Sequence, residues 1–263
     1  MKTYNALSKS FTDEVKIKMI EGSTIDEAFE DVKSAIIDYN FGEPTPTPKP
    51  IDVNELTQGD GQQDGYYYVD LGLSVKWATC NVGSTLASDD GLLFQFGRVD
   101  GYRYNDNNNQ FRTNAQNKQD TGNEYIPKTA SGKTYNVGET LQPADDAANV
   151  NMGGAWKMPT KDELQELFDN TTHDVVTVNG VQGMLFTSTK PGYEGKQLFI
   201  PFAGYWSDGS FTAAGSDADV WSSQVHPSYV DNAYRLGCYS SGNAYISSYS
   251  RSYAFSVRGV FQV

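Results

Sequence analysis

The sequence has few of the residues from which catalytic and metal sites are usually built. Its 263 residues include two histidines, His173 and His226, and two cysteines, Cys80 and Cys238. Two widely separated cysteines make neither a disulfide framework nor a zinc motif, so we expect two buried thiols, with a pairing across the fold left open. Neither histidine stands in a Ser-His-Asp or Cys-His context, which predicts ordinary surface or hydrogen-bonded histidines.

Basic charge and long apolar runs are also scarce. The chain carries 20 Lys and Arg against 33 Asp and Glu, a formal net charge of −13. Charge of this sign repels phosphate, so we expect no nucleic acid and no anionic membrane as partner. No run is apolar enough to span a bilayer, and the first 21 residues lack the apolar core of a secretory signal. The chain is therefore expected to fold in the cytoplasm or to leave the cell by another route, for instance in a virion.

The acidic residues do not form a recognisable catalytic or metal-binding pattern. Asp162, Glu163 and the Asp145-Asp146 pair open predicted helices, where carboxylates favour the helix dipole. No glycine-rich phosphate loop follows a strand. The amide-rich run 105–109 has ligands suited to calcium but no EF-hand spacing, so a solvated loop is favoured there. We expect no enzyme activity, no cofactor and no metal.

The N-terminal part of the chain predicts a helical module followed by a stalk. In residues 1–42 the run Thr24–Glu27 resembles a capping box, and apolar residues follow at helical spacing: Ile25, Ala28, Phe29, Val32, Ala35 and Ile36. We interpret this module as an anchor to another virion or scaffold protein or as an oligomerisation unit, a trimer by guess; the alternative is that it folds back on the main domain. Alternating prolines in residues 43–50, then polar residues to 65, predict a semi-rigid linker over 43–65.

Residues 66–263 are predicted to form a β-rich α+β head. Aromatic content is 13% and is dominated by tyrosine, which favours strands and loops over a helical bundle. Asn179-Gly180 predicts a hairpin turn between two strands, and Asp208-Gly209 predicts another turn. Thr160–Glu163 predicts a capped helix, and residues 143–150 predict another short helix. Residues 100–138 are expected to be a long polar loop.

The last part of the chain, from Asp219 onward, has the composition of a binding surface. Tyrosines are spaced through it with serine, asparagine and glycine between them. Tyrosine gives rigid amphipathic contact area, and the small polar residues give adaptable hydrogen bonds. The alternative is a serine- and tyrosine-rich edge of an ordinary β domain. The candidate ligand-binding residues are Tyr229, Asn232, Tyr234, Arg235, Tyr239, Ser241, Asn243, Tyr245, Tyr249, Arg251 and Tyr253.

Several segments of residues 65–263 resemble the Fibrobacter succinogenes major paralogous domain, which is frequent in Bacteroidetes and their phages. They are the stretch from Tyr68 to Gly83, Gly153-Gly154-Ala-Trp156-Lys-Met-Pro159-Thr160, Trp221-Ser222-Ser223 and Phe255-Ser-Val-Arg258. The resemblance implies a C-type-lectin-like fold related to the formylglycine-generating enzymes. It also implies that the segment around Trp156 is structural. Those enzymes use a pair of nearby cysteines, and Cys238 has no close companion in the sequence.

Within that fold, the tyrosine- and serine-rich segment resembles the variable region of proteins diversified by diversity-generating retroelements. This resemblance implies a phage fibre or tail protein on the virion surface, or a cell-surface adhesin, that binds a host glycan or protein. Two alternatives remain. One is a structural head-fibre or decoration protein without a specific ligand, and the other is an enzyme of the formylglycine-generating type.

Overall fold

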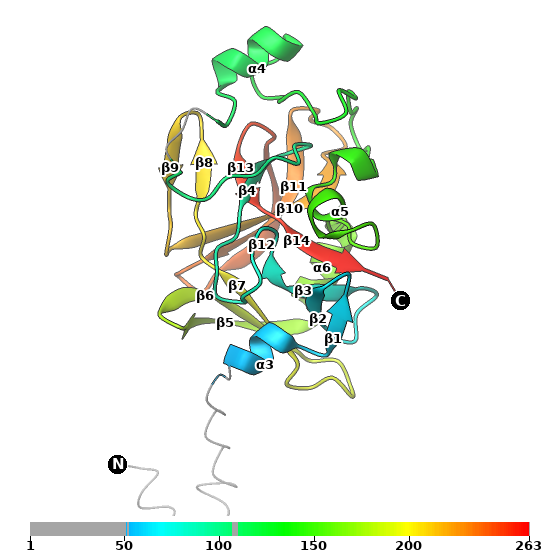
Figure 1. The fold of residues 1–263 in the computed structure, drawn as a ribbon, viewed down its shortest axis with the longest axis vertical. Helices are drawn as coiled ribbons and strands as arrows, with labels where there is room; N and C mark the ends of the chain where they lie inside the picture. Colours follow the sequence, from blue (N-terminus) through cyan, green and yellow to red (C-terminus); the bar gives the residue numbers. More distant parts are fainter. Residues whose placement is uncertain (1–50, 52, 107–109, 263) are drawn as a thin grey trace, which may run out of the picture. The chain divides into compact units, whose positions relative to one another are not determined.

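In the part of the chain that the structure describes, most of the regular secondary structure is β-strand in largely antiparallel sheets, and a few short helices accompany them (Figure 1). The computed structural model describes residues 51, 53–106 and 110–262. The predicted α+β class is therefore confirmed. Residues 1–42 and 43–50, with the predicted helical module and the proline-rich part of the linker, lie outside the described residues.

The described strands form three sheets, and the first of them joins the two ends of the folded unit. The last strand, β14, pairs antiparallel with β3 near the start of the unit. Sheet one has the order β1 (Gly61–Gln63), β2 (Tyr66–Val69), β3 (Lys76–Asn81), β14 (Arg258–Phe261).

The second and largest sheet carries most of the tyrosine-rich segment. Its strands lie in the order β12 (Ala244–Ser250), β11 (Asn232–Tyr239), β10 (Asp217–Val225), β13 (Ala254–Ser256), β8 (Tyr205–Ser207), β9 (Ser210–Thr212), and β4 (Leu93–Gln95) pairs with β13. The third sheet is β5 (Thr171–Val178), β6 (Val181–Ser188), β7 (Gln197–Pro201).

The hairpin turn predicted at Asn179-Gly180 and the turn predicted at Asp208-Gly209 are both present, and the second also connects two paired strands. Asn179 and Gly180 connect β5 to β6 with φ of 51° and 81°, and Asp208 and Gly209 connect β8 to β9 with φ of 37° and 100°. Two consecutive left-handed residues match the twist of the flanking strands, which explains why Asn-Gly and Asp-Gly stand there.

Five short helices are described: α3 (Val53–Gln58), α4 (Asn114–Thr121), the 3₁₀ helix η1 (Pro143–Asp145), α5 (Ala147–Met152) and α6 (Lys161–Asp169). The predicted capping box of α6 is confirmed: the Thr160 hydroxyl accepts from the Glu163 N–H at 3.2 Å, and Glu163 Oε2 accepts from the Thr160 N–H at 2.7 Å. Leu164 and Leu167 of α6 are fully buried in the core beside β10 and β11. None of the described helices is long and apolar enough to cross a membrane.

The four tryptophans and Arg258 are buried in the interior of the head. Trp77, Trp156, Trp206 and Trp221 are at most 2% exposed. Arg258 is fully buried and donates to Asn81 Oδ1 at 3.0 Å and to two backbone carbonyls, so its charge is well hydrogen-bonded. Burial removes the Arg258 cation from water, and this desolvation lowers the pKa of Arg258 to about 10.

The folded unit begins earlier than the sequence suggested. Ile51–Gly65, predicted as the second half of the linker, contains α3 and β1 instead. Leu56 of α3 is buried, and β1 pairs with β2 from Gly61 to Gln63. The prediction was wrong because three apolar residues, Ile51, Val53 and Leu56, and a three-residue strand are too few to form a clear periodic pattern in a polar sequence.

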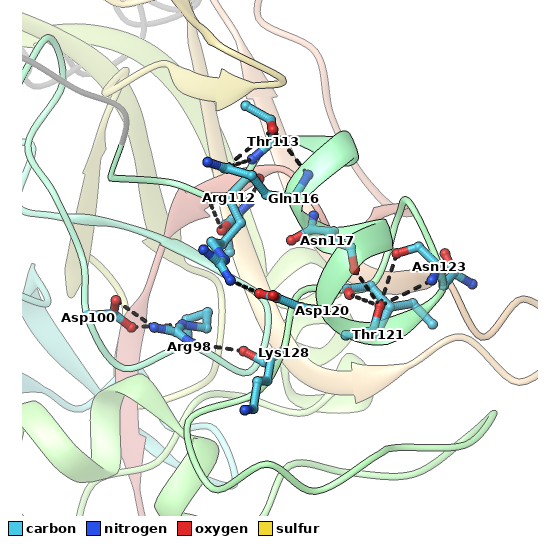
Figure 2. Close-up of polar contacts among 12 residues, drawn as sticks. Arg98, Asp100, Arg112, Thr113, Gln116, Asn117, Asp120, Thr121, Asn123 and Lys128 are labelled. Carbon is cyan, nitrogen blue, oxygen red and sulfur yellow. Dashed lines mark hydrogen bonds and ion pairs between the residues drawn. The ribbon is translucent and has the colours of Figure 1, made fainter.

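The long polar segment between β4 and η1 is also more ordered than predicted. It contains α4, whose capping box is formed by Thr113 and Gln116 (Figure 2). Figure 2 also shows the ion pair between Arg112 and Asp120, which connects the residue before the cap to the last turn of α4. The Asn114 N–H donates to Asp208 Oδ1 at 2.8 Å, so the β8–β9 turn holds the start of α4.

Candidate binding surface

Strands β11 and β12 present their side chains to two different faces of the second sheet. Leu236 and Cys238 belong to the core, with Ala244 and Ile246 of β12 packed against it. Since side chains alternate along a strand, the odd-numbered residues point to the opposite face. The residues on that face are Arg235, Tyr239, Tyr245, Ser247 and Tyr249, and the register places Arg235 beside Ser247 and Gly237 beside Tyr245.

Five tyrosines gather on this face, and we call them the tyrosine platform: Tyr205, Tyr239, Tyr245, Tyr249 and Tyr253. The rings of Tyr239 and Tyr245 stack at 5.2 Å between centroids, Tyr249 meets Tyr253 edge-on at 4.8 Å, and Tyr253 packs on Tyr205 at 5.8 Å. Tyr245 is 47% exposed and Tyr249 is 39% exposed. The platform therefore combines rings packed on one another with rings open to solvent.

Arg235 lies beneath the exposed rings. Its guanidinium carbon is 5.5 Å from the ring centroid of Tyr245, 5.2 Å from that of Tyr249 and 5.9 Å from that of Tyr239. Nη2 donates to the Tyr239 hydroxyl at 2.9 Å, and the Tyr245 hydroxyl donates to the same oxygen at 3.0 Å. Cation–π attraction and this hydrogen-bonded chain hold three tyrosines in place.

Asp219 of β10 is the counter-ion of Arg235. Its Oδ1 lies 2.7 Å from Arg235 Nη1, and both side chains are about as buried as the core, at 5% and 4% exposed. The N–H groups are not aligned with the carboxylate, so Asp219 Oδ1 and Arg235 Nε and Nη1 have no hydrogen-bond partner among the described residues. Burial outweighs the attraction of Arg235 and raises the pKa of Asp219 to about 6.

A second aromatic cluster lies apart from the platform and contains two of the predicted residues. Tyr229, 60% exposed in the β10–β11 loop, stacks on His226 at 4.9 Å, and Tyr234 packs on the same imidazole at 5.1 Å. His226 Nδ1 accepts from the N–H groups of Ser228 and Tyr229, which shapes the loop. Tyr234 has the strand parity opposite to Arg235, so the predicted residues do not share one face.

The remaining predicted residues lie at the strand ends. Ser241 and Asn243 are exposed in the β11–β12 turn, where the Asn243 amide donates to the Ser241 hydroxyl at 3.1 Å. Asn232 is half-buried at the start of β11.

Arg251 corrects the prediction, because it is fully buried and offers nothing to a ligand at the surface. Its guanidinium lies 5.1 Å from the ring centroid of Phe96 and donates to the Val230 carbonyl at 3.0 Å. Desolvation lowers its pKa to about 10. The turn after β12 directs this side chain inward, which the polar sequence around it did not reveal.

Four residues of the site were missed by sequence reasoning. Tyr205 comes from β8, Asp219 from β10 and Ser247 from β12, and Gly237 was passed over because it has no side chain. Asp219 stands two residues before the Trp221 motif, with nothing in its neighbourhood to indicate a buried carboxylate. Only the pairing of β10 with β11 brings it beside Arg235.

Cys80 and Cys238 are both buried free thiols, so the expectation of two unpaired cysteines is confirmed. Burial raises the pKa of each thiol, which keeps both protonated. Among the described residues no group of three or more His, Cys, Asp or Glu side chains is placed to hold a metal ion.

No protein-family model, curated protein sequence or solved structure matches this chain.

Proposed function

We propose that this protein is a displayed adhesin that binds a host-surface glycan or protein through the tyrosine platform. The observation that carries the proposal is the position of Arg235 beneath Tyr239, Tyr245 and Tyr249, two of which are exposed large aromatic residues. Exposed aromatic side chains that are already held in place lose little conformational entropy on binding, so they make effective anchors.

The platform suits a ligand without strong charge. Arg235 and Asp219 neutralise each other below the rings, and the sequence from Leu236 to Ser250 has no charged residue. Ring faces, tyrosine hydroxyls and the Ser247 hydroxyl remain available to the ligand. This combination favours the apolar face of a sugar ring, or an apolar side chain, with hydroxyl or amide groups at its edge.

The place of the protein is proposed as the virion surface of a phage of Bacteroidetes, with a cell-surface adhesin as the alternative. The support is the resemblance of its sequence motifs to the Fibrobacter succinogenes major paralogous domain and to retroelement-diversified proteins, which also suggests a C-type-lectin-like fold for the head. In this proposal residues 1–42 attach the protein to the particle.

A double substitution tests the proposed function. The labelled full-length protein is bound to a panel of Bacteroidetes cells, and Tyr245→Ala with Tyr249→Ala is compared with Tyr125→Ala, which removes a tyrosine that is 43% exposed outside the platform. Loss of one anchor costs on the order of 2 kcal/mol, so binding by the double variant should fall at least about 30-fold while Tyr125→Ala binds normally. Equal binding by the platform variant and the control contradicts the proposal.

A further inference from the structure

Strand β12 is the edge of the largest sheet, and its outer backbone groups have no partner among the described residues. The Tyr239 N–H donates to the Asn243 carbonyl and the Arg251 N–H donates to the Asp231 carbonyl, at the two ends of the β11–β12 ladder. Backbone bonding alternates along antiparallel strands, so the odd-numbered residues of β12 bond to β11. The N–H and C=O groups of Ala244, Ile246 and Ser248 therefore point away from β11, and no described residue bonds to them.

The β12 edge lacks the features that usually prevent the edge strands of two protein molecules from pairing. Natural edge strands carry charged residues, proline or a bulge. The seven residues of β12, Ala-Tyr-Ile-Ser-Ser-Tyr-Ser, include no charge and no proline, and their register with β11 is continuous. The run 236–250 has no charged residue in a chain with a net charge of −13, so no charged side chain of β12 opposes its pairing with a second copy.

We propose that β12 pairs antiparallel with β12 of a second copy of this chain, about a two-fold axis at Ser247. The sequence around Ser247 is nearly self-complementary, because Tyr245 and Tyr249 stand two residues on either side. In this register each Tyr245 faces Tyr249 of the partner subunit. The backbone of Ile246 in one subunit exchanges two hydrogen bonds with the backbone of Ser248 of the partner subunit. By symmetry, Ser248 in the first subunit does the same with Ile246 of the partner subunit.

Geometry and chemistry agree in this register. The N–H and C=O groups of the even-numbered residues, which point away from β11, face each other across the two strands and form hydrogen-bonded pairs. Ser247 lies opposite Ser247 of the partner subunit in a non-hydrogen-bonded pair, where the two strands are closest. Tyrosine pairs across strands stabilise a sheet, and no like charges oppose each other. A two-fold contact is closed, so it yields a dimer of heads and not a growing fibre. The two tyrosine platforms then lie side by side, which goes beyond the proposed function of a single head.

Site-directed disulfide formation tests the register. Cys80 and Cys238 are buried, so an introduced cysteine is the accessible thiol among the described residues. Ser247→Cys in the full-length protein should form a disulfide dimer on mild oxidation, because its Cα atoms are about 4.5 Å apart in this pairing. Ser241→Cys, exposed in the adjacent turn, is the control: its symmetry mate lies about 40 Å away, so it should not cross-link above background.

A backbone substitution separates strand pairing from chance contact. In the Ser247→Cys protein, Ser248→Pro removes an N–H that points away from β11, and proline is tolerated on edge strands. Cross-linking should fall at least tenfold, while Ser248→Ala, which keeps the N–H, should cross-link normally; an unchanged thermal midpoint shows that the head is folded. Equal cross-linking by Ser247→Cys and Ser241→Cys, or by the proline and alanine variants, overturns the pairing. Neither result bears on cell binding by the platform, which the tyrosine-to-alanine experiment measures separately.

Discussion

The side chain of Arg235 lies directly over Gly237. A Cβ atom built on Gly237 would stand 1.4 Å from Arg235 Nη1 and 2.9 Å from the Tyr239 hydroxyl. The two residues are neighbours on the same face of β11, so the guanidinium can turn along the strand only because position 237 has no side chain. Gly237 has no side chain to offer a ligand, but it determines where Arg235 lies and therefore the geometry of the tyrosine platform.

Gly237→Ala should therefore displace Arg235 and loosen the platform. We expect a loss of about 1–3 kcal/mol in the free energy of unfolding, as for overpacking of a well-packed site, measured by denaturant titration. Cell binding should fall as well. The matched control is Gly154→Ala, since a Cβ at this exposed glycine meets nothing within 4 Å. If the Gly237→Ala protein is as stable as this control, Arg235 can adopt another conformation without loss of stability, and the prediction is wrong.

Stability should depend on pH through Asp219. The pKa of about 6 in the folded protein lies above the ordinary value of 3.8, so the folded state binds this proton more tightly than the unfolded state does. The stabilisation is complete below pH 3.8 and is lost as the pH rises through about 6. Its size is on the order of 3 kcal/mol, at about 1.4 kcal/mol for each pKa unit.

Asp219→Asn should remove this contribution. The difference between wild type and variant in free energy of unfolding should change between pH 4 and pH 6, with wild type losing stability relative to the variant as the pH rises. Asp162→Asn serves as the control, because its side chain is 92% exposed. If the difference in free energy of unfolding stays constant across this range, Asp219 is not the group whose titration changes the stability.

The capping box of α6 should contribute measurably to the head. Thr160→Ala removes the hydroxyl that accepts from the Glu163 N–H, and we expect a loss of about 1 kcal/mol in the free energy of unfolding. Thr160→Ser keeps the cap and should lie within about 0.5 kcal/mol of wild type. Equal losses in both variants would assign the effect to the threonine methyl group instead of the cap.

The two thiols should be inert in the folded protein. Cys80 and Cys238 are at most 2% exposed, and burial raises the pKa of both. A chromogenic disulfide reagent should label neither thiol in buffer and both in denaturant. Rapid labelling of the folded protein would mean that the head opens near one of these residues.

Local signals in the sequence predicted the parts of the fold that depend on a few adjacent residues. Asn179-Gly180 and Asp208-Gly209 formed the expected turns, and Thr160 formed the expected helix cap. In each case the side chain or the glycine acts on its own backbone, so no distant partner is needed.

Elements without such a signal were missed. In α4 only Asn117 is buried, so no apolar stripe marks the helix, and its capping box lies in a run of polar residues. The fold of 51–65 depends on Leu56 reaching the core and on β1 meeting β2, which are contacts with other segments.

The sequence by itself determined the composition of the proposed binding surface: tyrosines and small polar residues at strand spacing, which need only the alternation of a β-strand to reach one face. The tertiary structure alone decided which of them stand together and what lies beneath them. Pairing of β10 with β11 placed Asp219 beside Arg235, and the turn after β12 buried Arg251. The reason is physical: burial and charge pairing arise between segments distant in the chain, and no neighbouring residue records them.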